Sequence, residues 1–435
     1  MSERRAEIRS MLTLLALLLV MSILVMASSG CSTGSTAEGR WQHEITTDGS
    51  RTVVHTFSGS IWGGTGRLVE EASIGATDGP DEYLLGSVQS LYAGNDQILV
   101  LDRQVPTLRV YDMEGRHIRD IGRKGGGPGE LESPRSVLLD PSDGRIFIRD
   151  GRQGRLNVYS PEGESVDTWP LVSGISTSRQ MVLTNDGDLF TSVFTSLESG
   201  RLRVGMAVVG PEGAGADTLM EPQYNFEPWE VEMRNENSIW IEEVPFAPSV
   251  WWAMCPDRSV VGGVSKEYQF EIFHHDGVVT VVKKEWDRVP VQLGEARWYR
   301  DRVTADFRAE FPGWAWNGKD VPGHKPAFVG LQPDLNGRIW VRCQGPGIHH
   351  EGCDEKPEDS SAFYRDPCWT ETYFFDVFDM NGRYLGRVDA PDKLLPRPVP
   401  FIDGDLFLGL VEDEDGTLYV KRYRLELPAS TDEDR

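Results

Sequence analysis

The sequence predicts an all-β fold in which a repeated unit of short strands closes into a ring. Three observations predict it. Apolar segments recur at an offset of 48 residues, each copy alternates strands with tight turns, and a segment near the start of the chain matches the strand missing from the last copy. Short strands bounded by such turns are typical of antiparallel sheets, and a long fixed period is typical of stacked structural repeats.

The repeat is clearest in the first third of the chain. Residues 98–102 (ILVLD) match 146–150 (IFIRD), and residues 108–115 (LRVYDMEG) match 156–163 (LNVYSPEG). In both copies a turn joins two apolar strands, and a Glu-Gly step follows the second. Glycine adopts a positive φ at little cost, so this step suits a tight hairpin that leads into a further strand.

Weaker copies complete the ring. Parts of the pattern return within residues 187–213, 259–277, 337–382 and 416–427, which gives six units, with seven as the alternative. The last copy stops without its outermost strand. Residues 67–75 resemble the outer strand 115–122 of the first copy. We therefore expect the segment from Leu68 to Ile74 to lie beside residues 418–425, because pairing there removes the exposed edges of an open ring.

A glycine-rich link joins the two clearest copies. It consists of residues 121–122 (IG), 125–131 (GGGPGEL) and 133–134 (SP). With this link the chain resembles six-bladed β-propellers of the NHL-repeat type, best over residues 66–171. The resemblance implies a six-bladed β-propeller closed by the N-terminal strand, with one inserted amphipathic helix. The link does not predict a phosphate site, because Glu130 and Leu131 follow its glycines, where a phosphate loop has a lysine and a hydroxyl residue.

The inserted helix is expected within residues 295–311. Four bulky side chains recur there every four residues, which places them on one helical stripe. The stripe consists of Tyr299, Val303, Phe307 and Phe311. Pro312 and Gly313 then end the helix. We interpret it as a surface helix packed on the rim of the propeller, with a lid over the central channel as the functional alternative.

A second insertion, residues 344–370, contains two of the four cysteines that remain if Cys31 is modified, and Cys343 directly precedes it. Cysteines of an exported protein can form disulfides. We favour the pair Cys353 and Cys368, with Cys343 as a competing partner for either. Sequence alone does not fix the connectivity.

The first thirty residues resemble a lipoprotein signal peptide. Arginines come first, a run of sixteen mostly apolar residues follows at 11–26, and small residues lead to Cys31. The apolar run is shorter than the roughly 20 residues of a spanning helix, although a membrane anchor is the alternative. Residues 28–31 (SSGC) resemble the lipobox of bacterial lipoproteins, which implies lipidation of Cys31. Ser32 follows it, which in that family indicates the outer rather than the inner membrane.

These features predict an exported protein that is lipid-anchored in the bacterial cell envelope. They divide the chain into a signal peptide (1–30), a tether (31–50), a β-propeller domain (51–428) and an acidic tail (429–435). The net charge of -24 disfavours nucleic-acid binding, because such a surface repels phosphate backbones. We expect a monomer with no cofactor.

Several residues are candidates for ligand binding. Trp314 and Trp316 lie on a loop rich in proline and glycine, so we interpret them as a surface platform for a sugar or peptide. His349 and His350 carry metal-ligand groups, but adjacent histidines on one loop rarely converge, and we assign no metal site. His324 is the fifth candidate, because it precedes an inner strand and can face the channel. By contrast, Trp251, Trp252 and Trp340 lie in strand patterns and are expected in the core.

Asp102 and Asp150 end equivalent strands of two copies. A ring of carboxylates that holds a cation is one interpretation. We favour the other, in which each carboxylate accepts hydrogen bonds from backbone amides of the next turn, because the residue recurs at the same position of the repeat.

Two functions are compatible with these patterns. The first is a binding or scaffolding lipoprotein whose channel face holds an envelope protein, a peptide or a glycan. The second is a metal-dependent propeller enzyme with lactonase- or lyase-like activity, which the resemblance to propeller enzymes implies. Fold alone does not decide between them, and the sequence contains no HExxH motif.

Overall fold

The fold is taken from a computed structural model, which describes residues 39–171, 181–196, 202–234, 239–353 and 367–428. The chain divides into a unit of residues 1–38 and a compact unit that begins at Gly39. Only the second is described here. It is built almost entirely of strands, and its described part contains one α-helix, α2 (Leu293–Glu310), and the short 3-10 helix η1 (Asp81–Tyr83).

The propeller has six blades, each a four-stranded antiparallel sheet. Blade 1 comprises β4 (Val88–Gly94), β5 (Gln97–Asp102), β6 (Thr107–Asp112) and β7 (His117–Ile121). Blade 2 comprises β8 (Pro134–Leu139), β9 (Ile146–Asp150), β10 (Arg155–Tyr159) and β11 (Ser165–Pro170). Blade 3 comprises β12 (Met181–Leu183), β13 (Leu189–Ser196), β14 (Leu202–Gly210) and β15 (Gly213–Met220).

The second half of the ring is more irregular. Blade 4 comprises β18 (Val250–Met254), β19 (Val260–Val264), β20 (Gln269–Phe273) and β21 (Val279–Lys284). Blade 5 comprises β22 (Leu331–Pro333), β23 (Arg338–His349), β24 (Trp369–Asp379) and β25 (Tyr384–Asp389). Blade 6 comprises β26 (Phe401–Asp403), β27 (Leu406–Glu412), β28 (Leu418–Glu426) and β3 (Thr65–Ile74), the strand from the start of the chain. The six-bladed prediction is confirmed.

Closure of the ring also follows the prediction. β3 pairs antiparallel with β28, so that Leu68 lies opposite Leu425 and Ile74 opposite Val420. On its other side β3 makes a short parallel contact with β25, which joins blades 5 and 6 into one continuous sheet. The edge that the last blade would otherwise expose is therefore covered.

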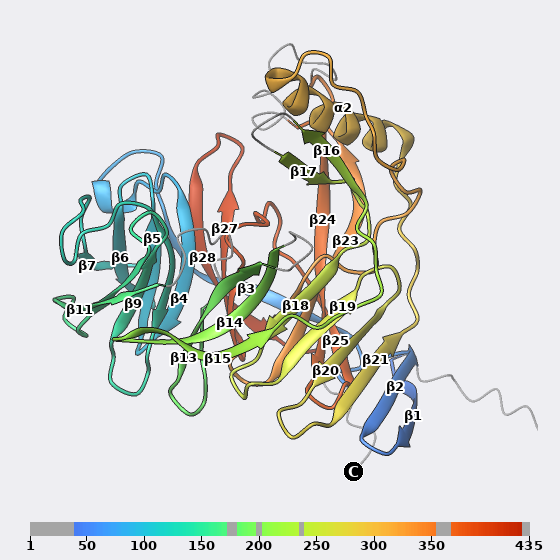
Figure 1. The fold of residues 1–435 in the computed structure, drawn as a ribbon, viewed down its shortest axis with the longest axis horizontal. Helices are drawn as coiled ribbons and strands as arrows, with labels where there is room; N and C mark the ends of the chain where they lie inside the picture. The colour runs from blue at the N-terminus through green and yellow to red at the C-terminus, as the bar shows by residue number, and fades with distance from the viewer. Residues whose placement is uncertain (1–38, 172–180, 197–201, 235–238, 354–366, 429–435) are drawn as a thin grey trace, which may run out of the picture. The chain divides into compact units, whose positions relative to one another are not determined.

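An N-terminal hairpin adds two strands to blade 4. β1 (Gln42–Asp48) pairs with β2 (Arg51–Ser58), and β2 runs parallel to β21; Figure 1 shows both strands beside β21. Part of this hairpin, residues 42–50, falls in the segment expected to be a tether. All seven side chains of β1 are exposed, so the alternation of apolar and polar residues that marks a strand is missing there.

The hydrophobic core is divided among the spaces between blades. Between blades 1 and 2, Leu101 packs near Ile148, and between blades 6 and 1, Leu408 packs near Ile98. Similar clusters fill the other four spaces. Trp340, 1% exposed, lies between blades 5 and 6 as expected for a core residue.

The strand directions give the propeller two different ends. At one end, tight hairpins join the strands within a blade, and Gly115 in such a turn has a φ of 84°, as its Glu-Gly step predicts. The other end carries the links between blades, and we call it the insertion end. The segments 221–249, 285–330 and 344–369 all leave and re-enter the blades there, because they connect strand ends on that side.

Candidate functional site

Three insertions meet at the insertion end and pack into a small structure of their own. They are the hairpin of β16 (Glu230–Arg234) and β17 (Ile239–Glu243), the helix α2, and an arm formed by the extended ends of β23 and β24 (Figure 1). Val303 and Phe307 of α2 pack against Val231 and Met233 of the hairpin. The predicted stripe is therefore correct for Val303 and Phe307, and it faces the hairpin.

The first turn of α2 is fixed to the end of the same insertion by a buried ion pair. Nζ of Lys325 lies 2.8 Å from Oε1 of Glu295, and neither side chain has any exposed surface. The second oxygen of Glu295 accepts a hydrogen bond from the backbone N–H of Gln292, which closes a capping box. A Cβ atom on Gly347 of the arm would lie 2.4 Å from the Glu295 carboxylate, so the arm can approach this closely only with glycine.

A second group of polar side chains lies between α2 and the arm. Glu371 lies beside the phenols of Tyr299 and Tyr373 and within electrostatic reach of Lys325, and the Tyr299 hydroxyl donates to the carbonyl oxygen of Trp369 at 3.4 Å. Burial raises the pKa of Glu371, and it raises the pKa of Tyr373 to about 12. Both side chains keep some exposed surface. We call Glu295, Tyr299, Lys325, Glu371 and Tyr373 the polar cluster.

The polar cluster brings together a carboxyl group with a raised pKa, two phenols and a buried cation. Such perturbed groups are often found at functional sites, although structural networks perturb pKa values in the same way. Chemically, the cluster can hold a proton on Glu371 and hydrogen-bond a polar ligand. No sequence motif marked it, but the alternation of Trp369, Glu371 and Tyr373 along one strand places all three on one face.

Trp314 is not the surface residue that the sequence analysis expected. It is 9% exposed, its ring packs against Phe307 at 4.6 Å between centroids, and its Nε1 donates to the carbonyl oxygen of Glu232 at 2.9 Å. The indole fills the space between α2 and β16. A ring of this size buries a large apolar area and so stabilises this small core. Trp316 is half-buried, with the guanidinium of Arg300 4.9 Å from its ring centroid.

The loop that carries Trp314 borders an open groove of about 380 Å³. The groove is lined by Glu232, Met233, Arg234, Phe311, Pro312, Gly313, Trp314 and Asn317. Carboxylate, guanidinium, amide and aromatic groups therefore face one space, a composition that suits a peptide or a glycan.

His349 and His350 lie near the start of α2, whereas the groove lies near its end. The ring of His349 lies 4.8 Å from that of Trp369, and Nε2 of His350 is hydrogen-bonded to the Thr370 hydroxyl at 2.8 Å. Both are exposed on the arm, beside the first turn of α2. His324 is exposed and pairs through its backbone with Pro290. A helix of α2's length spans about 27 Å, so the histidines and Trp314 do not form one site.

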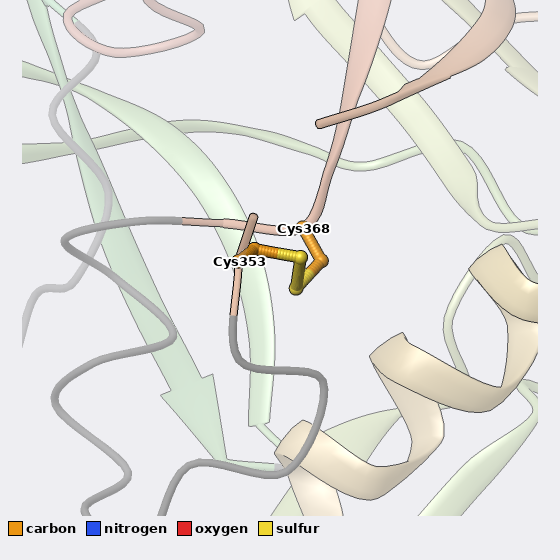
Figure 2. Close-up of a disulfide and its surroundings, with 2 residues drawn as sticks. All are labelled: Cys353 and Cys368. Atoms are coloured by element: carbon orange, nitrogen blue, oxygen red, sulfur yellow. A yellow bond between two sulfur atoms is a disulfide. The ribbon is translucent and has the colours of Figure 1, made fainter. Parts of the chain in front are cut away.

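Cys353 and Cys368 form a disulfide at the tip of the arm, which is the pairing that the sequence analysis favoured (Figure 2). The competing partner Cys343 is a buried free thiol in the core between blades 4 and 5. Cys368 packs with Trp298 of α2 and Trp369. The disulfide therefore helps to seat the helix on the arm.

The repeated aspartates are structural. Asp102 accepts hydrogen bonds from the backbone N–H groups of Gly86, Ser87 and Gln104, and Asp150 occupies the same position in blade 2 with the same kind of partners. Across the described ranges, no three His, Cys, Asp or Glu side chains lie together in a way that could hold a metal ion. No helix within those ranges is both long and apolar enough to cross a membrane.

A comparison with known protein families agrees with the observed fold. A protein family described as a 6-bladed beta-propeller matches residues 78–187. No curated protein matches the sequence. Among solved structures, the chain is similar to a member of the DUF4221 family from Bacteroides vulgatus, at 8% identity and a TM-score of 0.44, over 84% of this chain and 99% of that one. It is also similar to virginiamycin B lyase from Staphylococcus aureus, at 8% identity and a TM-score of 0.38, over 81% and 98% of the two chains.

Proposed function

We propose that this protein is an exported lipoprotein of the bacterial cell envelope whose propeller binds a partner protein, peptide or glycan at the insertion end. Export and lipidation at Cys31 are inferred from residues 1–31, which lie outside the described residues. The single observation that carries the binding role is the meeting of three insertions at one end of the propeller. Loops on a rigid scaffold are where binding groups tend to be found.

The chemistry of the insertion end supports this role. It combines the groove beside Trp314, the polar cluster around Glu371 and exposed aromatic and apolar side chains of β17. The opposite end carries the tight turns within blades and a groove of about 400 Å³ beside the hairpin β1–β2. A partner that contacts the insertion end would find hydrogen-bonding groups next to apolar surface, the usual composition of a recognition site.

Site-specific photo-crosslinking in the native envelope tests the binding role. A photoreactive amino acid is placed at Arg297 or Lys319 on the insertion end, and at Glu114 or Glu162 in turns of the opposite end; all four residues are exposed. We expect an adduct of one defined mass from the insertion end alone. Equal adducts from both ends, or none from the insertion end, would contradict the proposal.

Metabolic labelling with a radioactive fatty acid tests the anchor. The wild type should incorporate label and Cys31→Ser should not, while Cys343→Ser serves as the cysteine control and keeps the label. The enzymatic alternative stays a prediction. It is tested by metal analysis of the purified protein, together with lactone and cyclic-peptide substrates in the presence and absence of a chelator.

A further inference from the structure

The hairpin β16–β17 has two edges, and they differ in their backbone hydrogen bonding. The β16 edge is capped by side chains of the loop after α2. The Glu232 N–H donates to Oδ1 of Asn317 at 3.2 Å, and the Glu232 carbonyl accepts from Nδ2 of Asn317 at 2.8 Å and from Nε1 of Trp314 at 2.9 Å. The backbone groups of Glu232 therefore point away from β17.

This capping fixes which groups the β17 edge displays. Glu232 lies opposite Ile241, so this pair does not exchange hydrogen bonds, and by alternation the neighbouring pairs do. Trp240 and Glu242 consequently bond to β16. The N–H and C=O groups of Ile239, Ile241 and Glu243 point to the opposite edge, where no hydrogen bond from the described part of the chain reaches them.

The side chains along this edge are exposed and apolar. Ile239 is 50% exposed, Trp240 45% and Ile241 56%. Exposed strand edges pair readily with other strands, so proteins usually protect them by charges, prolines or bulges. An Ile-Trp-Ile edge with neither proline nor bulge is therefore suited to accept a further strand.

The charges around the edge indicate the kind of strand. Glu242 and Glu243 follow the apolar residues on β17 itself. Glu230 and Glu232 lie on β16, where Arg234, the one basic residue of the two strands, forms an ion pair with Glu232 at 3.4 Å. Opposite charges on neighbouring strands stabilise a sheet by about 0.2–1 kcal/mol for each pair, whereas like charges destabilise it. A second copy of this chain would bring two acidic hairpins together, so a basic partner fits better.

We propose that β17 binds an extended peptide segment by strand addition, and that this segment alternates apolar residues with lysine or arginine. The proposal rests on the binding role of the insertion end and specifies its partner. Backbone pairing with Ile239, Ile241 and Glu243 supplies affinity, and the glutamates select for basic side chains.

A labelled synthetic nonapeptide of alternating valine and lysine is the probe, with a valine–glutamate peptide as its matched control. Binding to the full-length protein is measured by fluorescence anisotropy. Ile241→Pro removes one outward N–H without touching the bonds to β16, because proline is tolerated where its nitrogen faces outward at a strand edge. Ile241→Val keeps the N–H and is the matched control variant.

We expect the valine–lysine peptide to bind at least ten times more tightly than the valine–glutamate peptide. Ile241→Pro should weaken binding at least tenfold, and Ile241→Val less than twofold. The double variant Glu242→Lys/Glu243→Lys should reverse the peptide preference. Equal binding of the two peptides, or equal binding by Ile241→Pro and Ile241→Val, would overturn the proposal.

Hydrogen exchange on the wild type gives a readout that does not depend on any variant folding. Added peptide should slow exchange at the amides of Ile239, Ile241 and Glu243, and leave Trp240 and Glu242 unchanged. Unchanged exchange at the outward amides, or a concentration-dependent dimer that Ile241→Pro abolishes, would refute a peptide as the occupant. If crosslinks from the insertion end persist in Ile241→Pro at full yield, the end still binds a partner and only the role of β17 fails.

Discussion

Replacing Lys325 by methionine should destabilise the insertion end far more than replacing Lys325 and Glu295 together. The two side chains form an ion pair at 2.8 Å with no exposed surface on either. Removing one partner leaves the other as a buried charge without compensation. Removing both leaves apolar side chains of similar volume in the same space.

The magnitudes follow from this burial. Breaking a buried ion pair from one side costs about 3–5 kcal/mol in the free energy of unfolding, while replacing both partners by apolar residues is often neutral or stabilising. The double variant also loses the capping box that Glu295 makes with Gln292, which costs about 1 kcal/mol. We therefore expect the double variant Glu295→Met/Lys325→Met to lie within about 1 kcal/mol of the wild type.

Urea unfolding, followed by tryptophan fluorescence, measures these free energies. Hydrogen exchange of the α2 amides locates the change. Asp320→Asn is the matched control, because it removes an exposed ion pair from the same insertion. Asp320 pairs with Arg300, and its side chain is 93% exposed, so its loss should change the free energy of unfolding by less than about 1 kcal/mol. If the Lys325→Met single variant is no less stable than the double variant, the ion pair does not hold α2 and the reasoning is wrong.

Three further outcomes are expected. Because burial raises the pKa of Glu371 in the folded protein, this group stabilises the fold at acidic pH and that contribution is lost as pH rises above the ordinary value of a glutamate; Glu371→Gln should flatten the stability–pH curve there, and an unchanged slope would contradict the shift. Replacing Cys353 and Cys368 by serine should cost about 3 kcal/mol for a loop of this length and speed proteolysis of the arm, with unaltered proteolysis as the contrary result. Asp102→Asn should lower the free energy of unfolding by at least about 2 kcal/mol without altering divalent-cation binding in calorimetry, and a lost calorimetric signal would instead indicate a cation site.

The ring could be predicted from the sequence because local patterns determine it. Apolar strands and turns that end in glycine recur in each blade, the first two blades share a fixed period, and the match between residues 67–75 and 115–122 identified the closing strand. Each strand and turn is recognised from a few neighbouring residues, and comparing one copy with the next shows the repeat. These signals are missing from β1, whose side chains are all exposed and which pairs with β2 alone.

The insertion end could not be predicted in the same way, because long-range contacts make it. Lys325 had no evident partner in the sequence, and its partner Glu295 lies on the other side of the helix and its following loop. Trp314 was misplaced because a loop rich in proline and glycine suggests exposure, whereas α2 and β16 together enclose the indole. Glu371 acquires its raised pKa only when α2 covers the arm.

The start of the compact unit crosses the outer strands of three blades in succession. Residues 42–58 pair with blade 4, Ile61 and Trp62 donate backbone hydrogen bonds to carbonyl groups of β25 in blade 5, and β3 completes blade 6. Every one of these partners is synthesised well after the segment that needs it. The first strands of the unit thus gain their partners one blade at a time as the chain grows, and a polypeptide that stops before residue 418 would leave β3 without its antiparallel partner β28.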